Sequence, residues 1–216
     1  LEVAHSIASA VEFMHAKGIV NRDIKCGNIG FDFHGEVRLF DLGLARILPV
    51  ASNQAEIGGF KMSRVGTNLY MAPEVRAREL YGLAVDVYSF GVVLWEILSL
   101  STPTSKMTKL RDEIQRPDST RTDDWLPICS CWPRQLQELV RGCTSYNPQD
   151  RPSMAEVRSC LYQLSLETGV KQRMINVPTR KRRSTIRFDL TLLEDPVLRS
   201  SYNSDTSILL DEHDDL

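Results

Sequence analysis

The chain has 216 residues, of which 42% are hydrophobic, and a formal net charge of -2. This length allows one sizeable core in one or two domains, and the charge points to no particular class of partner. The longest apolar run, Val85 to Leu100, falls short of the ~20 residues that a membrane span requires and contains Asp86 and Glu96, so it predicts a core helix. Five cysteines without a metal-binding spacing favour reduced thiols over a disulfide scaffold.

The chain opens with an amphipathic pattern. Apolar residues at spacings of three and four predict a helix over residues 1 to about 17, ended by Lys17-Gly18. His5 and His15 lie on or near this helix, and we expect packed or surface histidines rather than ligands.

A hairpin is expected next. Ile29 to Phe33 alternates apolar with small or polar residues, Val37 to Phe40 is rich in strand formers, and His34-Gly35 between them is typical of a turn. Such a hairpin holds the loop before it and the loop after it at one edge. Asn28 and Asp41, thirteen positions apart, are therefore expected to converge.

Four polar residues around this hairpin suit phosphoryl transfer, in which catalysis is mostly positioning and stabilisation of charge. Asp23 supplies a carboxylate for an incoming hydroxyl, and Lys25 supplies a cation for the phosphate. Asn28 and Asp41 supply the oxygen ligands that magnesium prefers. Cys26 lies among carboxylates that disfavour a thiolate, so we expect no nucleophilic role for it.

Five motifs, in order, resemble those of the eukaryotic protein kinases. They are NRDIKCGN at Asn21 to Asn28, DLG at Asp41 to Gly43, APE at Ala72 to Glu74, DVYSFGVVLWEIL at Asp86 to Leu98 and NPQDRPS at Asn147 to Ser153. The resemblance covers residues 1 to about 165. Lys25, together with GTNLYMAPE at Gly66 to Glu74, resembles the serine/threonine type, whereas the central helix has a tyrosine-kinase-like character.

The resemblance implies a mainly α structure of the α+β family. It corresponds to the C-terminal lobe of a kinase domain over residues 1–166, with a short β-hairpin at the catalytic loop, followed by a charged tail over residues 167–216. The glycine-rich loop, strand Lys and helix Glu of the N-terminal lobe are not found, so we expect that lobe to be absent from this chain and the fragment alone to be inactive or nearly so.

The implied activity is transfer of the ATP γ-phosphoryl to Ser or Thr hydroxyls of a protein substrate, with ATP and Mg²⁺ as cofactors. Asp23 is then the catalytic base, Lys25 a catalytic and nucleotide-binding cation, and Asn28 and Asp41 the ligands of the metal and nucleotide. The alternative is a pseudokinase or scaffolding module that binds proteins without catalysis. Asn21, which stands where the family usually has His, and the missing N-terminal lobe favour the alternative. The four intact polar residues favour the enzyme.

Further positions follow from the resemblance. Thr67 would contact Asp23 and Lys25 in the substrate-binding loop, and Asp86 would accept hydrogen bonds from the catalytic-loop backbone. Glu74 and Arg151 would form a buried pair that fastens the activation segment to the later helices.

Residues 44 to 70 read as an activation loop. A phosphate on Ser52 or Ser63 would pair with Arg22 and order this segment. The alternative is that both serines are only solvated loop residues.

Helical periodicity recurs at 105 to 117, 133 to 144 and 153 to 166, where it indicates core packing. Beyond it, Lys171 to Arg187 contains seven Lys or Arg and no acid, whereas Asp189 to Leu216 contains eight acids and one Arg. Such blocks are typical of a disordered tail. One alternative is a nuclear-localisation signal in an otherwise cytoplasmic protein. Another is a regulatory site at Ser184 or Thr185 that a base-preferring kinase recognises, with a regulatory protein as the partner of the tail. No aromatic interleaving supports a nucleic-acid partner.

Overall fold

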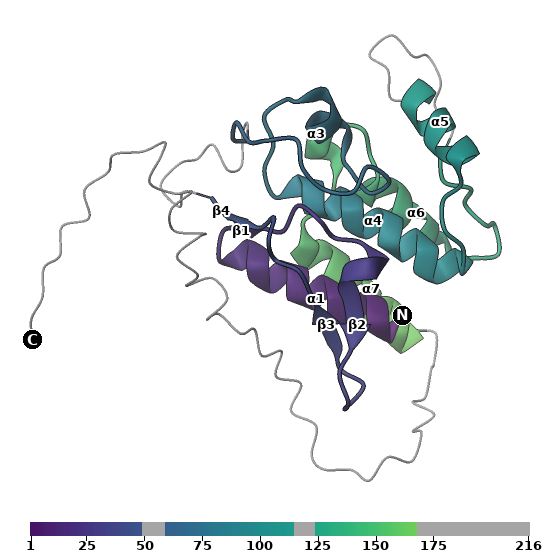
Figure 1. Ribbon diagram of the computed structural model, residues 1–216. Coiled ribbons are helices and arrows are strands. Elements are labelled where there is room, and N and C mark those ends of the chain that lie inside the picture. Colours follow the sequence, from purple (N-terminus) through teal and green to yellow (C-terminus); the bar gives the residue numbers. More distant parts are fainter. Residues whose placement is uncertain (49–58, 115–123, 168–216) are drawn as a thin grey trace, which may run out of the picture. The chain divides into compact units, whose positions relative to one another are not determined.

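The computed structural model describes residues 1–48, 59–114 and 124–167 (Figure 1). Ser52, the basic run from Lys171 to Arg187 and the acidic segment after it lie outside the described residues. The expectations of an activation-loop phosphate at Ser52 and of a charged tail therefore stay predictions.

Helices dominate the described residues, and the two sheets have two strands each. The helices are α1 (Glu2–Ala16), α3 (Pro73–Ala77), α4 (Ala84–Ser99), α5 (Ser105–Ile114), α6 (Arg134–Cys143) and α7 (Met154–Glu167), with 3-10 turns at Cys26–Asn28 (η1) and Pro148–Asp150 (η2). The strands are β1 (Ile19–Val20), β2 (Ile29–Phe31), β3 (Val37–Leu39) and β4 (Arg46–Ile47). The expectation of a mainly helical lobe with a short hairpin is confirmed.

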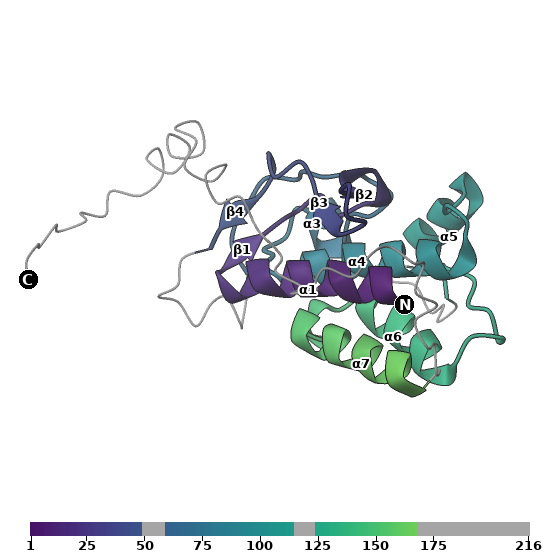
Figure 2. The same ribbon diagram turned by 90° about the horizontal axis from the view of Figure 1, so that it is seen from below.

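Four helices enclose the core. α1 packs against α4 and α7, and α6 packs against the same two helices, so the four close around one apolar interior (Figures 1 and 2). α4 is the central element, because every residue from Val85 to Glu96 is buried. A helix that is apolar on nearly all sides can satisfy that pattern only inside a core. None of the helices in the described ranges is long and apolar enough to cross a membrane.

A glycine allows the closest approach between two of these helices. A Cβ atom added at Gly91 of α4 would lie 2.6 Å from Cβ of Cys143 and 2.8 Å from Cγ2 of Thr144, at the end of α6. Real Cβ atoms do not approach so closely, so the contact of α4 with α6 requires glycine at this position.

The predicted hairpin is present as β2 and β3, which pair Ile29 with Leu39 and Phe31 with Val37. Its turn is closed by Asp32, whose carboxylate accepts hydrogen bonds from the backbone N–H groups of His34 and Glu36, both at 2.9 Å. The second sheet was not anticipated. Its two short strands, β1 and β4, flank the catalytic loop and the hairpin.

One expectation about the cysteines is wrong. Cys129 and Cys131 form a disulfide, with their Cα atoms 5.2 Å apart. The chain turns sharply there, since the backbone N–H of Cys131 lies 3.2 Å from Sγ of Cys129, and this turn brings the two side chains together. Cys26, Cys143 and Cys160 are free thiols, as expected.

Candidate active site

The backbone of the loop that carries Asp23 is hydrogen-bonded to the first turn of α4. Asp86, fully buried, accepts hydrogen bonds from the backbone N–H groups of Asn21 (2.7 Å) and Arg22 (2.8 Å), one on each carboxylate oxygen. Nε2 of His15, from the end of α1, lies 3.0 Å from the same carboxylate. Asp86 of α4 therefore holds the backbone of the loop, and His15 of α1 holds the carboxylate of Asp86.

Asn21 also acts through its side chain. Its Oδ1 accepts a hydrogen bond of 3.0 Å from the backbone N–H of Asp23, so the amide braces the residue two positions on. Between them, Arg22 has a φ of 71°, in the left-handed region that non-glycine residues seldom occupy. Such strain persists only where surrounding contacts over-determine the backbone, and it clusters at functional sites.

Asp23 is the point on which the site converges. Its Oδ1 accepts hydrogen bonds from the backbone N–H (3.0 Å) and the hydroxyl (2.8 Å) of Thr67. Its Oδ2 accepts from Nζ of Lys25 (2.6 Å) and from the side-chain amide of Asn28 (3.1 Å). Lys25 also donates to Oγ1 of Thr67 at 3.0 Å, so Asp23, Lys25 and Thr67 form a closed triangle.

These contacts control the charge of Asp23. Burial alone would raise the pKa of this carboxyl, but the hydrogen bonds from Lys25 and Thr67, the charge of Lys25 and the bond from Asn28 together hold its pKa below the usual value of 3.8. The carboxylate is therefore ionised at neutral pH and able to accept a proton or orient a hydroxyl.

A glycine lets the segment that contains Thr67 approach this carboxylate. Gly66 has a φ of 102°, and a Cβ atom there would lie well inside contact distance of the carbonyl oxygen of Arg22. The residue that follows, Thr67, reaches Asp23 only because Gly66 tolerates both the backbone conformation and the close contact.

Two residues on helices hold the segment that follows Thr67. Nη1 of Arg111, on α5, donates to the carbonyl oxygens of Asn68 and Leu69, both at 3.0 Å. Oγ of Ser89, on α4, donates to the carbonyl oxygen of Tyr70 at 2.8 Å. The loop is thus held from two helices as well as by Asp23.

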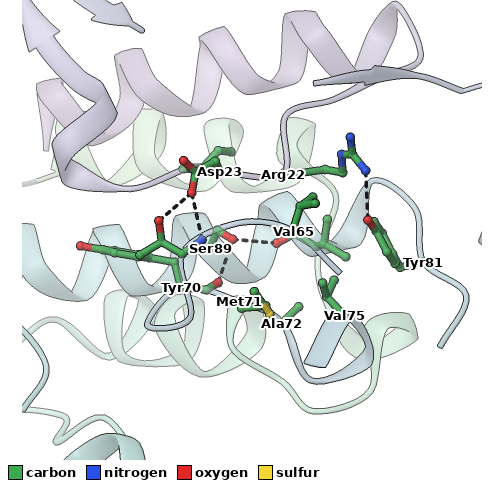
Figure 3. Close-up of a pocket in the computed structure, with 12 residues that line it drawn as sticks. Arg22, Asp23, Val65, Tyr70, Met71, Ala72, Val75, Tyr81 and Ser89 are labelled. Carbon is green, nitrogen blue, oxygen red and sulfur yellow. Dashed lines mark hydrogen bonds between the residues drawn. The ribbon is translucent and has the colours of Figure 1, made fainter. Parts of the chain in front are cut away.

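Arg22 points away from the catalytic carboxylate, toward Tyr81 (Figure 3). Nε of Arg22 donates to the carbonyl oxygen of Leu44 at 2.6 Å, and Nη1 donates to the Tyr81 hydroxyl at 3.3 Å. The Tyr81 hydroxyl in turn donates to the carbonyl oxygen of Ser63 at 2.6 Å. A small cavity lies beside these residues, and its lining includes Arg22, Val65 and Tyr81 (Figure 3).

Glu74 and Arg151 form a doubly bonded ion pair, with N–O distances of 2.7 and 2.8 Å, and Arg151 is fully buried at its side chain. Arg151 also donates to the carbonyl oxygens of Ser145, Ala84 and Tyr146. Five hydrogen bonds use its full donor capacity. The pair connects α3, the start of α4 and the loop before α7.

The two residues expected to hold magnesium flank the hairpin, because Asn28 directly precedes β2 and Asp41 follows β3 by two positions. The backbone N–H of Phe40 donates to the carbonyl oxygen of Asn28 at 2.8 Å, so the two ends of the hairpin are joined. Asn28 uses its amide nitrogen on Asp23, which leaves its amide oxygen for a ligand. Asp41 is exposed, with a φ of 57°. Amide and carboxylate oxygens fit a hard cation such as magnesium.

Cys26 is not a nucleophile. Its Sγ donates to a carboxylate oxygen of Glu96 at 3.0 Å, an oxygen that also accepts from the Tyr70 hydroxyl at 2.9 Å. Burial, the hydrogen bond to Glu96 and the charge of that carboxylate raise the pKa of the Cys26 thiol to about 12. The thiolate is therefore rare at neutral pH.

Every predicted site residue in the described ranges is found at or near the catalytic loop or in the Glu74–Arg151 pair. Four contributors were not predicted: His15, Tyr81, Ser89 and Arg111. A signal existed for Arg111, because it occupies a core-facing position in the apolar stripe of Met107, Leu110 and Ile114. A charged residue at such a position usually has a buried partner.

The chain is similar to known proteins over most of its length. The family model described as protein kinase domain matches residues 2–162. A probable serine/threonine-protein kinase of Dictyostelium discoideum is 35% identical over 157 residues, which are 73% of this chain and 24% of that protein. A second one from that organism is 30% identical over 164 residues, 76% of this chain and 17% of the other.

The serine/threonine-protein kinase STY17 of Arabidopsis thaliana is 31% identical over 179 residues, 80% of this chain and 29% of that protein. The chain thus spans less than a third of the length of these curated relatives. The match of one family model to most of the chain, on a helical lobe with this site, identifies the chain as a member of the protein kinase family.

Proposed function

We propose that this chain is the substrate-binding and magnesium-binding part of a serine/threonine protein kinase, which transfers the γ-phosphoryl of ATP to protein Ser or Thr hydroxyls. The observation that carries the proposal is the triangle of Asp23, Lys25 and Thr67. It places an ionised carboxylate and a cation within 2.6 Å of each other, beside the loop that would hold the acceptor peptide.

Each residue has one task in this reaction. Asp23 orients the acceptor hydroxyl and takes its proton as the new P–O bond forms and the bond to the leaving ADP breaks. Lys25 stabilises the negative charge on the transferring phosphoryl group. Asn28 and Asp41 would hold magnesium, which neutralises phosphate charge when it is bound.

The acceptor class is proposed from the same triangle. Lys25 bonds to Asp23 and Thr67 at once, which draws the substrate-binding loop close to the catalytic carboxylate. A short Ser or Thr side chain must bring its backbone close to this loop, and the closed triangle suits that approach. The relatives, which are named as serine/threonine kinases, support the same class.

The test is phosphoryl transfer by the full-length protein from labelled ATP to otherwise identical peptides with Ser, Thr or Tyr as the acceptor. We expect transfer to Ser and Thr, and a loss of at least about 100-fold in Asp23→Asn, the usual scale for a general base. Asp32→Asn is the matched control, because Asp32 only closes the hairpin turn and pairs with Arg38. Equal transfer by wild type and Asp23→Asn would refute the proposal.

The competing candidate is a non-catalytic scaffolding module. Asn21 favours it, since the amide is committed to the backbone of Asp23 and cannot provide an imidazole ring. Binding of MgATP without transfer to any acceptor, or no binding, would support this candidate. A coding sequence upstream of Leu1 with a glycine-rich loop and a strand lysine would support the enzyme.

A further inference from the structure

The disulfide of Cys129 and Cys131 lies in a turn whose two ends are anchored separately. Both cysteines are exposed. Before the turn, the carbonyl oxygen of Pro127 accepts a hydrogen bond of 2.8 Å from the indole N–H of Trp95, on α4. After the turn, the carbonyl oxygen of Trp132 accepts one of 2.8 Å from a side-chain amide on α6. These hydrogen bonds hold the turn without the sulfur atoms.

The disulfide itself adds little to the stability of the fold. A disulfide stabilises mainly by restricting the unfolded chain, and this effect grows with the length of the loop that the bond closes. Cys129 and Cys131 are only 2 positions apart, so the closed loop is very short. The bond is therefore poorly suited to a structural role.

The other cysteines are protected from thiol–disulfide exchange, because the thiolate is the reactive form. Cys143 is fully buried, and burial raises the pKa of its thiol to about 12. Cys160 is partly buried, and burial raises the pKa of its thiol as well. Burial and the hydrogen bond to Glu96 raise the pKa of Cys26 to about 12. The exposed disulfide is therefore the place where exchange can occur.

The two sulfur atoms of the disulfide differ in their surroundings. The backbone N–H of Cys131 donates to Sγ of Cys129 at 3.2 Å. A hydrogen bond to a sulfur atom favours its charged form, so Sγ of Cys129 is the better leaving group when the bond opens. An incoming thiolate is then expected to attack Sγ of Cys131.

We propose that Cys129 and Cys131 form a reversible redox site whose co-reactant is a dithiol. A thiolate of the dithiol attacks Sγ of Cys131, so a mixed disulfide forms and Cys129 leaves as a thiolate. The second thiol of the co-reactant then attacks the co-reactant's own sulfur in the mixed disulfide, and Cys131 leaves. The protein gains two electrons and two protons, and the dithiol is oxidised to a disulfide. Asp23 and the nucleotide take no part, so this inference goes beyond the proposed function and does not depend on it.

Reversibility is tested on the full-length protein without denaturant. The protein is incubated first with dithiothreitol, a small dithiol, and then with excess oxidised glutathione. After each step iodoacetamide labels free thiols, and mass spectrometry identifies the labelled residues. We expect Cys129 and Cys131 to be labelled together after dithiothreitol and to be protected again after glutathione, while Cys143 stays unlabelled throughout. A bond that stays closed in dithiothreitol, or thiols that do not close in oxidised glutathione, would overturn the proposal.

Single variants test the direction of the exchange. Cys131→Ser keeps Cys129 with the backbone N–H of residue 131 as its donor, and Cys129→Ser keeps Cys131. We expect the mixed disulfide with glutathione to form at least about threefold faster in Cys131→Ser, because its thiolate is the better stabilised one. Equal rates would overturn the assigned direction of attack. Cys160→Ser is the matched control and should keep the wild-type disulfide.

A double variant separates redox chemistry from a structural role. Without reductant, Cys129→Ser/Cys131→Ser should melt within about 5 °C of wild type, because the closed loop is short and the turn keeps its anchors. A fall of more than about 10 °C would show that the disulfide is needed for the fold, and would overturn the proposal. Circular dichroism measures both transitions.

Discussion

At the scale of single residues, the ionisation of Asp23 depends on which neighbours donate to it. Burial raises its pKa, and Lys25, Thr67 and Asn28 more than reverse that effect. Because the folded-state pKa lies below the ordinary 3.8, ionised Asp23 contributes to the free energy of unfolding above that pH. This contribution is lost as the pH falls through the lowered pKa.

Removal of Lys25 should therefore change the pKa of Asp23 as well as the rate of phosphoryl transfer. In Lys25→Met we expect the pKa of Asp23 to rise, since burial and the remaining bonds from Thr67 and Asn28 act without the cation. The acid limb of the pH profile of kcat at saturating MgATP should shift to higher pH. Lys61→Met, at an exposed lysine, is the control. An unshifted acid limb in Lys25→Met would contradict this account.

Gly66 offers a second test at the residue scale. Gly66→Ala combines a positive φ with a clash against the carbonyl oxygen of Arg22, whereas Gly35→Ala has a positive φ with no atom within 4 Å of the new methyl group. Left-handed strain costs about 1–2 kcal/mol in either variant. We expect Gly66→Ala to lose more stability and to lose transfer activity. Equal melting temperatures and equal activity in the two variants would argue against the close contact.

The residues of the site differed in how well the sequence could predict them. Asp23, Lys25 and Asn28 lie within six consecutive positions, so local order alone brings them together. Tyr81 meets Arg22 across 59 positions and Arg111 meets Asn68 across 43. No short motif encodes such contacts, which depend on how the helices pack.

At the scale of elements, the long helices were predicted because their apolar spacing repeats over several turns. The expected helices at 105 to 117, 133 to 144 and 153 to 166 correspond to α5, α6 and α7. The β1–β4 sheet was missed because each strand has only two residues and its partner lies across the whole hairpin. The Cys129–Cys131 disulfide was missed because its formation depends on a local turn that the spacing does not reveal.

The Glu74–Arg151 pair should matter for stability before it matters for chemistry. Arg151→Ala leaves a buried carboxylate and three carbonyl oxygens without their donor, and the free energy of unfolding should fall by about 3–5 kcal/mol. Arg134→Ala, which removes only an exposed pair with Glu138, should change it by no more than about 0.5 kcal/mol. Denaturant titration measures both, and an unchanged midpoint in Arg151→Ala would refute the role.

We expect phosphorylation of the activation segment to regulate activity. A phosphate on Ser52 or Ser63 would pair with Arg22, whose guanidinium in this structure reaches the Ser63 backbone through Tyr81. We expect the Ser52→Ala/Ser63→Ala double variant to be less active than wild type. Full activity in that variant, or mass spectrometry of the active protein without phosphate on either serine, would exclude the hypothesis.

At the scale of the whole molecule, the described helices share one core and should unfold together. Trp95 and Trp125 are buried in that core, so their fluorescence reports on its packing, and circular dichroism reports on the helices. We expect the two thermal transitions to coincide. A fluorescence change that precedes the loss of helix would show that the core opens in stages. Trp132→Phe removes the less buried tryptophan and sharpens the comparison.

Helix α5 is attached to the segment beside Asp23 through the side chain of Arg111. One guanidinium nitrogen of Arg111 holds two consecutive carbonyl oxygens, and the residue before them touches Asp23. A shift of α5 must either break both hydrogen bonds or carry Asn68 and Leu69 with it. The position of α5 is therefore coupled, through two hydrogen bonds of Arg111, to the segment that contacts Asp23.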